Sequence, residues 1–379
     1  MKKLVFITDI GFKEKDLSKF GIEYLKKKFD VKILDITKLS NFKFLNNKKI
    51  CDEQIILNEW EDLQIYFKNN TINFAIDFVS DYETKKKLFK ILKLKKISTG
   101  YWQNHITLKI KKTIKERIIN FFFTFLDLKR IKAKIRFSFF KKDIDYFKYD
   151  FLLSCGLEGL KYDYISPNTK IIKAHSLEYE NLKNNFSVFN NFNQEISVFL
   201  DQFLPFHPDA IFVKKFNPKT TEKKYFPALN KFFDDFEKST NTKVIIAAHP
   251  KSDYENRNCW GSRKFIKNDS LDLVKNSKFV LAHQSTSLSY AVLLKKKIIF
   301  LTSNEYIRSY DNFTVHGYSR YFNMPLFNID DYSPNDILKN LDKAKINKYE
   351  DYVKNYIKYN LNDTRGIWEI LSDELNNNI

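Results

Sequence analysis

Three apolar runs in the second half of the chain end in polar residues that could contact a charged ligand. The polar ends are Asp201-Gln202, His249-Pro250-Lys251 and His283-Gln284-Ser285-Thr286-Ser287. In open α/β sheets, ligands bind beyond the carboxyl ends of the parallel strands. If the three runs are strands, their polar ends mark the place where a binding site is expected.

The hydroxyl run Ser285-Thr286-Ser287 falls where the third strand passes into a helix. Free backbone N–H groups, hydroxyls and the positive end of the helix dipole together form an anion site. Capping of the helix alone explains one serine or threonine at this place, but three consecutive hydroxyls exceed what capping requires. We therefore expect the run to bind a phosphate, together with Lys251, Gln202 and His283 from the strand ends.

His249 follows the apolar run 244–248, and Pro250 prevents regular strand pairing beyond it. A histidine fixed at the end of a strand can act as a general acid toward a leaving phosphate. A purely structural histidine is the alternative. The adjacent Lys251 favours the catalytic interpretation, because its charge is complementary to phosphate. A second pair, His207-Pro208, has no such clean apolar strand before it.

The pair His249-Pro250, followed by Ser285-Thr286 at the start of a helix, resembles the HP motif and the Ser-Ser/Thr motif of bacterial sialyltransferases, polysialyltransferases and related ultonic-acid transferases. The runs 200–209 and 175–180 also look like bacterial surface-polysaccharide transferases. The resemblance implies a GT-B fold, in which two Rossmann-like domains with parallel sheets face each other across a cleft. In that family the histidine protonates or hydrogen-bonds the CMP leaving group, a role that falls here on His249. The hydroxyls of the family hold the CMP phosphate, a role that falls on Ser285 and Thr286.

The acidic motif that supplies the catalytic base in that family has only a partial counterpart here, Leu157-Glu158-Gly159. Other candidates are Glu178 and Glu180, which follow the apolar run 170–174, and Asp201. Each of them could equally be a capping or solvent-exposed acid, and we expect one of the set to be the base. The resemblance implies neither a metal nor a cofactor. The Asp-x-Asp form at 143–145 lies away from any predicted strand end.

Apolar runs alternate with helical patterns along the chain, which predicts an α/β protein with parallel sheets. Strands are expected at 4–7, 31–36, 72–79, 151–155, 170–174, 196–200, 244–248, 279–282 and 298–301. Helices are expected at 17–29, 81–94, 225–239, 271–276 and 286–294. The length of 379 residues suits two cores. We expect an acceptor-side domain over 1–190, a donor domain over 191–345, and helices within 346–379 that could pack back onto the first domain.

The formal net charge of +19 calls for a polyanionic partner. Between residues 105 and 142, within the expected first domain, twelve Lys or Arg stand against two acids, and seven Phe are interleaved. This composition suits an amphipathic element on an anionic membrane surface; a helix pair whose Phe residues pack in the first core is the alternative.

No run reaches the roughly 18 apolar residues of a membrane-spanning helix. The three cysteines lack disulfide or metal-ligand spacing. We expect a cytoplasmic protein, peripheral at the inner face of the membrane.

The resemblance implies an inverting, metal-independent transferase that moves a sialic-acid-like (nonulosonic or Kdo-type) sugar from a CMP donor to a bacterial surface glycan, such as lipooligosaccharide, capsule or glycolipid. A UDP-sugar transferase or an epimerase of the same fold is the alternative. The charge also suggests a nucleic-acid-binding protein, but it is concentrated in one Phe-rich segment without a nucleic-acid motif. An inactive scaffold subunit remains a further alternative, because an intact and a decayed site could differ only at the unidentified base.

Overall fold

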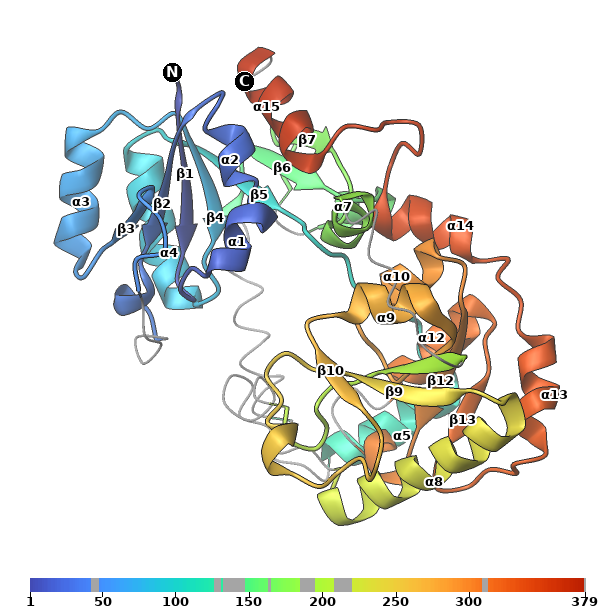
Figure 1. The fold of residues 1–379 in the computed structure, drawn as a ribbon. Coiled ribbons are helices and arrows are strands. Elements are labelled where there is room, and N and C mark those ends of the chain that lie inside the picture. Colours follow the sequence, from blue (N-terminus) through green and yellow to red (C-terminus); the bar gives the residue numbers. More distant parts are fainter. Residues whose placement is uncertain are drawn as a thin grey trace. The chain divides into compact units, whose positions relative to one another are not determined.

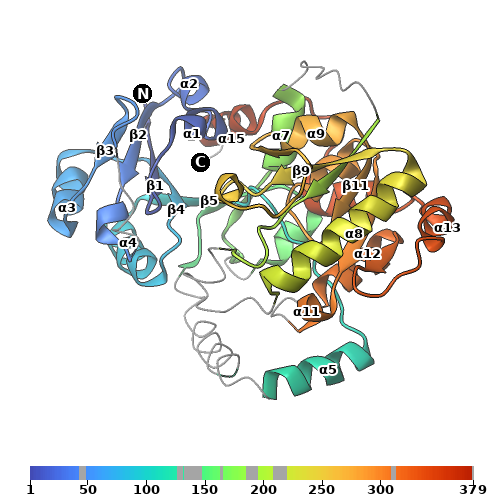
Figure 2. The same ribbon diagram turned by 60° about the horizontal axis from the view of Figure 1, so that its bottom comes forward.

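The computed structural model describes residues 1–41, 48–125, 131, 147–162, 165–184, 195–207, 220–308 and 313–377. The chain divides into two compact units (Figures 1 and 2). The first unit contains Met1–Ile106, Ser138–Glu180 and Lys354–Ile379, and the second contains Thr107–Phe137 and Asn181–Val353.

The first unit is built on a sheet of seven parallel strands in the order β3-β2-β1-β4-β5-β6-β7. The strands are β1 (Lys3–Thr8), β2 (Asp30–Asp35), β3 (Gln54–Ile56), β4 (Phe74–Phe78), β5 (Ser98–Trp102), β6 (Phe151–Ser154) and β7 (Lys170–Lys173). The helices are α1 (Glu14–Lys19), α2 (Ile22–Leu25), α3 (Trp60–Asn69), α4 (Tyr82–Leu94) and α15 (Ile367–Asn377), together with the first four residues of α7 (Leu177–Asn184). Alternate residues of β1 enter different cores, since Leu4 and Phe6 belong to one buried cluster and Val5 and Ile7 to another. Both faces of this sheet are therefore buried, as expected for parallel strands.

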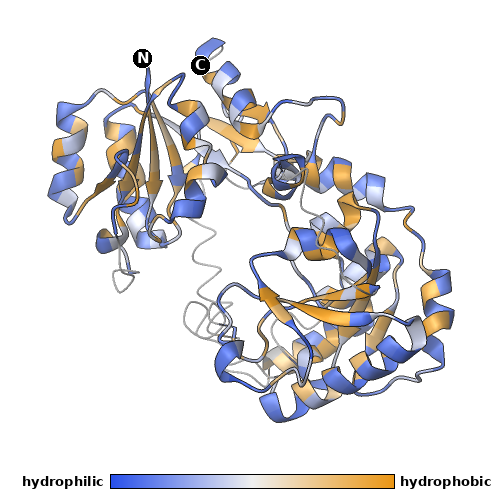
Figure 3. Cartoon of the chain, in the orientation of Figure 1, coloured by the Kyte–Doolittle hydropathy of each residue, from blue (hydrophilic) through white to orange (hydrophobic). Residues whose placement is uncertain are grey.

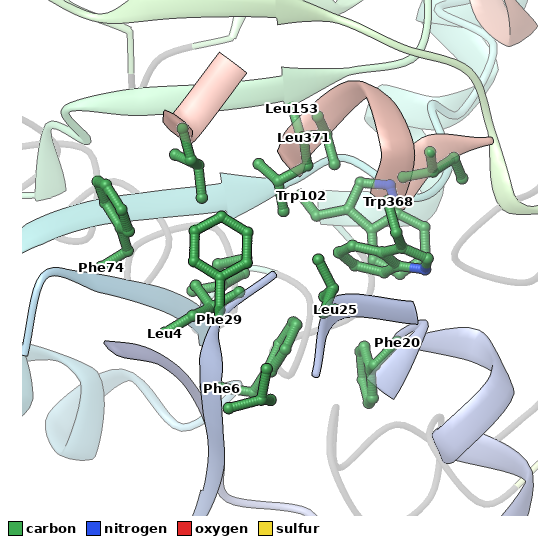
Figure 4. Close-up of a cluster of buried hydrophobic side chains, with 14 of the residues drawn as sticks. Leu4, Phe6, Phe20, Leu25, Phe29, Phe74, Trp102, Leu153, Trp368 and Leu371 are labelled. Atoms are coloured by element: carbon green, nitrogen blue, oxygen red, sulfur yellow. The ribbon is translucent and has the colours of Figure 1, made fainter. Parts of the chain in front are cut away.

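The C-terminal helix α15 packs into the core of the first unit (Figure 4). The Trp368 ring lies edge-on to Trp102 and Phe6, with ring centroids 4.9 and 5.7 Å apart. Its indole N–H donates to the Lys19 carbonyl at 3.0 Å. Gly21 makes room for this ring: its φ is +55°, and a Cβ there would lie 2.1 Å from Trp368. Residues far apart in sequence thus share one core.

The second unit is built on six parallel strands in the order β10-β9-β8-β11-β12-β13. The strands are β8 (Ile196–Leu200), β9 (Lys243–Ala248), β10 (Phe265–Lys267), β11 (Ser277–Ala282), β12 (Lys297–Thr302) and β13 (Leu326–Asn328). The helices are α5 (Ile114–Phe125), α8 (Glu222–Thr240), α9 (Ser270–Asn276), α10 (Leu288–Leu293), α11 (Asn304–Ile307), α12 (Thr314–Phe322), α13 (Asp336–Lys343) and α14 (Tyr349–Tyr352). Most strands of both sheets are hydrophobic over much of their length (Figure 3).

Every predicted strand is present in one of the two sheets. The helix expected over 17–29 is instead two short helices, α1 and α2, because the left-handed backbone of Gly21 separates them. Strands β3, β5, β10 and β13 and helices α3, α7, α11, α12 and α13 were not predicted. Residues 107–125 of the basic segment lie with the second unit, whereas we expected that segment in the first domain. In the part of the chain that the structure describes, no helix has both the length and the apolar character needed to cross a membrane.

Candidate functional site

The strand order places a topological switch point in each sheet. In the first unit the chain builds β1, β2 and β3 outward and then returns to the other side of β1 with β4; in the second unit β8 and β11 have the same relation. Ligands of doubly wound sheets bind beyond the carboxyl ends of the strands at such a point. In the second unit this point carries Asp201 and Gln202 after β8, and the run 283–287 after β11.

Asp201 holds the end of β9 in place. Its carboxylate accepts hydrogen bonds from the backbone N–H groups of Phe203 (2.9 Å) and His249 (3.2 Å) and from the Tyr254 hydroxyl (3.0 Å). Burial raises the pKa of Asp201 to about 6, although these donors favour the ionised form. A carboxylate so enclosed positions His249 and is poorly placed to take a proton from an acceptor substrate.

The contacts of His249 define its tautomer. Its Nδ1 accepts the Lys251 N–H at 3.2 Å, so a neutral ring carries its proton on Nε2. The ring is half-buried, parallel to Phe203 with centroids 6.5 Å apart, and 5.1 Å from the ring of His207. The structure therefore brings both candidate histidines together, at the carboxyl end of β9.

The hydroxyl run has a partly local role. The Ser285 hydroxyl accepts the Ser287 N–H at 3.2 Å, a contact within the turn that leads into α10. Thr286 is exposed and Ser287 is half-buried, and neither side chain makes a hydrogen bond within the described residues. The turn contact thus explains one hydroxyl of the run, and the other two are available to a ligand.

Two buried polar atoms near these strand ends have no hydrogen-bond partner in the described part of the chain. They are Oε1 of Gln202, after β8, and Oγ of Ser252, three residues after His249. An unsatisfied buried acceptor or donor costs about 1–3 kcal/mol, so each is expected to meet a water or ligand group. Gln202 was a predicted ligand contact, and Ser252 was not. The exposed Lys251 lies between His249 and Ser252 in the chain.

His283 is a structural residue, in contrast to the predicted ligand contact. It is fully buried, its Nδ1–H donates to the Leu301 carbonyl at 2.6 Å, and its Nε2 accepts the Tyr225 hydroxyl at 2.6 Å. Burial lowers the pKa of His283 to about 4, against the effect of the Leu301 hydrogen bond. The neutral ring joins β11, β12 and α8, and it has no exposed edge for a ligand.

Glu178 and Glu180, the other predicted acids, both lie on α7. Glu180 is 2.5 Å from Nε2 of the buried His175, and it accepts the N–H of Ile367 at 3.2 Å, so it joins the end of β7 to the start of α15. Glu178 pairs through Oε1 with Nδ1 of His105 at 3.3 Å. Its Oε2 is buried and has no hydrogen-bond partner among the described residues. Of the three predicted acids, Glu178 is the one with an unused carboxylate oxygen.

A cavity of ≈ 410 Å³ lies at the switch point of the first unit, which is within the usual volume of a small-ligand site. It is lined by Thr8, Ile10, Gly11, Asp16, Lys19, Phe20, Phe78, Val79, Ser80, Lys85, Tyr101, Trp102 and Asn104. Gly11, with φ of +79°, turns the chain directly after β1. Glu178 is linked to this cavity through its neighbour in the chain. The N–H of Leu177 donates to the carbonyl of the lining residue Asn104 at 2.9 Å, and His105, the partner of Glu178, follows Asn104.

The two lysines of this cavity differ in their partners. Lys85 is 2.8 Å from a carboxylate oxygen of Asp77, which neutralises its charge. Lys19 is half-buried, its ammonium lies 5.0 Å from the Phe20 ring centroid, and it makes no ion pair or hydrogen bond to the described residues. Burial lowers the pKa of Lys19, since the charged form is partly removed from water. The cavity therefore contains a lysine beside aromatic rings, with the carboxylate of Asp16 nearby in the lining and no direct ion pair to the described residues.

The sequence reasoning missed this first-unit cavity, and with it Lys19, Tyr101 and Asn104. A signal was present, because Asp9 and Ser80 follow strands β1 and β4 just as Asp201 follows β8. Within the described residues no group of His, Cys, Asp or Glu could hold a metal ion. The Asp-x-Asp form at 143–145 lies outside those residues.

No protein-family model and no curated protein matches the sequence. Among solved structures, the chain is similar to a variant of the wall teichoic acid polymerase TagF soaked with CDPG, with 13% identity over 99% of this chain and 87% of that one, and a TM-score of 0.55. It is also similar to the glycotransferase of kitacinnamycin (8% identity, 98% and 97% covered, TM-score 0.51). A third similar structure is the calicheamicin glycosyltransferase CalG4 (6% identity, 99% and 98% covered, TM-score 0.50). At such identities the likeness concerns the fold, and the two parallel-sheet α/β units match the GT-B fold that was predicted.

Proposed function

We propose that the chain is an inverting, metal-independent glycosyltransferase that takes a nonulosonic or Kdo-type sugar from a CMP donor and passes it to a bacterial surface glycan or glycolipid. The observation that carries the proposal is His249, which Asp201 fixes at the carboxyl edge of the second sheet with its proton on Nε2. A fixed N–H at this edge suits a leaving phosphate. The His-Pro and Ser-Thr motifs favour CMP over other nucleotides.

In the proposed reaction the acceptor hydroxyl forms the new C–O bond as the bond between the sugar and the CMP phosphate breaks. The electron pair of the broken bond leaves with the phosphate, whose developing charge the His249 Nε2–H stabilises by donating a hydrogen bond. Thr286, Ser287 and Lys251 contact the same phosphate. Glu178 is our candidate for the base that takes the acceptor proton, because its Oε2 has no hydrogen-bond partner in the described chain.

The acceptor belongs, in this proposal, to the cavity of the first unit. Tyr101 offers a half-buried ring for sugar packing, and Asn104 and Ser80 offer polar groups. Lys19, which forms no direct ion pair with the described residues, favours an acceptor that carries a carboxylate or a phosphate near the reacting sugar.

A nucleotide screen tests the donor. CMP, CDP, UDP and GDP are compared by thermal shift and calorimetry; a ligand at 100 times its Kd stabilises the protein by about 2.7 kcal/mol. We expect CMP to give the largest shift, and Lys251→Ala to weaken CMP binding by about tenfold, the loss of one charge-assisted contact. Lys278→Ala is the matched control, because Lys278 is exposed near the amino end of β11, at the opposite edge of the sheet.

Two outcomes would redirect the proposal. Preference for UDP would favour the alternative UDP-sugar transferase or epimerase, and preference for CDP would favour a donor like the CDPG of the TagF soak. Equal loss of CMP binding in Lys251→Ala and Lys278→Ala would show that CMP does not bind at the carboxyl edge of the second sheet.

A further inference from the structure

Helix α5 turns its polar side toward the second unit. Glu116 is buried and accepts two hydrogen bonds from Arg320 of α12, at 2.6 and 2.9 Å. The same glutamate accepts the Thr113 N–H, while the Thr113 hydroxyl accepts the Glu116 N–H, so the helix begins with a capping box. Ile110, just before the helix, packs on Gly317, where a Cβ would lie 2.6 Å from it. These contacts fix the helix on the unit and set its rotation.

The opposite side of α5 is apolar and exposed. Its side chains are Ile114 (77% exposed), Ile118 (53%), Phe121 (63%), Phe122 (58%) and Phe125 (69%). At about 100° per residue, these positions cover an arc of roughly 100° that excludes Glu116. Figure 2 shows α5 at the margin of the second unit. A contiguous apolar face of this kind marks an interaction surface, because isolated proteins rarely leave one in water.

Basic residues flank the apolar face of α5. Lys115 and Arg117 are exposed, lie on either side of the face, and form no ion pair with the described residues. Lys109, Lys111 and Lys112 precede the helix, and residues 126–142 add seven Lys or Arg against one acid. This arrangement is complementary to an anionic lipid surface. A second copy of the chain is disfavoured as the occupant, since both copies would bring the same positive charge.

We propose that α5 is an in-plane anchor, which inserts its apolar face into the headgroup layer of an anionic bilayer while Lys115 and Arg117 contact lipid phosphates. Phenylalanine and isoleucine supply the apolar term of binding, and the flanking cations supply preference for anionic lipid. The Glu116–Arg320 pair transmits the attachment to the second unit. The inference does not depend on the donor or on the proposed catalytic residues.

Vesicle flotation tests the anchor with the full chain. Vesicles of phosphatidylglycerol with phosphatidylcholine are compared with vesicles of phosphatidylcholine alone, at low and high salt. We expect the wild type to float with the anionic vesicles and to dissociate in part at high salt. Phe121→Ser/Phe125→Ser should lower binding by about tenfold or more per phenylalanine, and Lys115→Glu/Arg117→Glu by about tenfold or more. Leu338→Ser, which removes an exposed apolar side chain of α13, is the control and should bind as the wild type does.

Circular dichroism checks that each variant keeps its thermal midpoint, since the substituted side chains are exposed. The proposal fails if the wild type does not float, if it floats equally with both vesicles, or if Phe121→Ser/Phe125→Ser floats like the wild type. It also fails if sedimentation shows a dimer that this double variant dissociates, while no vesicle binding is seen. In that case a second copy of the chain covers the helix.

Discussion

Asp201 links the pH dependence of stability to the geometry of the candidate site at the carboxyl edge of the second sheet. Its pKa is raised to about 6 in the folded protein, against about 3.9 in an unfolded chain. Between these pH values the folded state binds the proton more tightly than the unfolded chain does. The contribution of protonated Asp201 to the free energy of unfolding is therefore present at low pH and is lost as pH rises through about 6. At ~1.4 kcal/mol per pH unit, the loss between pH 4 and pH 7 is about 2–3 kcal/mol.

The substitution that isolates this contribution is Asp201→Asn, which removes the titration. Urea unfolding of both proteins at pH 4, 5, 6 and 7, followed by circular dichroism, gives the difference in unfolding free energy at each pH. We expect the wild type to lose about 2–3 kcal/mol relative to Asp201→Asn over this range. Tyr254→Phe removes one donor to the carboxylate, so the loss should extend to higher pH. A difference that stays constant from pH 4 to pH 7 would mean that Asp201 is not desolvated, and the account of how it holds His249 would be wrong.

Three further predictions concern single residues. His249→Ala should lower kcat by roughly 10²–10³, the loss of one hydrogen-bond donor to the leaving phosphate, without changing the thermal midpoint, and His207→Ala should have a smaller effect; equal effects would move the catalytic role away from His249. Lys19→Met should raise the KM for an acidic acceptor by about tenfold or more and leave that for a neutral sugar unchanged, whereas a parallel rise for both would argue against a charge contact. Gly21→Ala should destabilise the first unit by several kcal/mol, because left-handed backbone costs about 1–2 kcal/mol outside glycine and the Trp368 ring must move; a near-normal urea midpoint would contradict the described packing.

The central strands could be predicted because burial on both faces selects continuous apolar runs. Residues 244–248 and 298–301 are such runs, and they form β9 and β12. Strand β5 reads as Ser-Thr-Gly-Tyr-Trp, without that signature. Its Gly100 is required by tertiary packing, because a Cβ there would lie 2.0 Å from the Phe151 ring. A neighbour some fifty residues away in the chain leaves no local pattern, so this strand could not be found from sequence.

The candidate site could be predicted by residue type but not by role. The polar strand ends were found because side chains after a parallel strand are exposed at the edge of the sheet. His283 and His249 look alike in sequence, both following an alanine at the end of a strand. Their roles differ because His283 is enclosed by Tyr225, Leu301 and Tyr306. Such enclosure depends on elements that are distant in the chain. The cavity of the first unit was missed for the same reason, since its lining comes from several separate elements.

Both sheets end their first strand in a buried aspartate that shapes a neighbouring loop. Asp9 accepts the N–H groups of Ser80 and Asp81 at 2.9 and 2.7 Å, and Asp201 accepts that of His249. Burial raises the pKa of Asp9 and of Asp201, so each ionised carboxylate reduces stability at neutral pH relative to its protonated form. Each carboxylate also fixes the conformation of a loop. The loop held by Asp9 contributes Ser80 to the lining of the cavity in the first unit, and the loop held by Asp201 orients His249 in the second. Asp9→Asn and Asp201→Asn should therefore impair ligand binding or turnover at neutral pH more than their unfolding free energies would suggest, and in Asp9→Asn the loss should be confined to the acceptor.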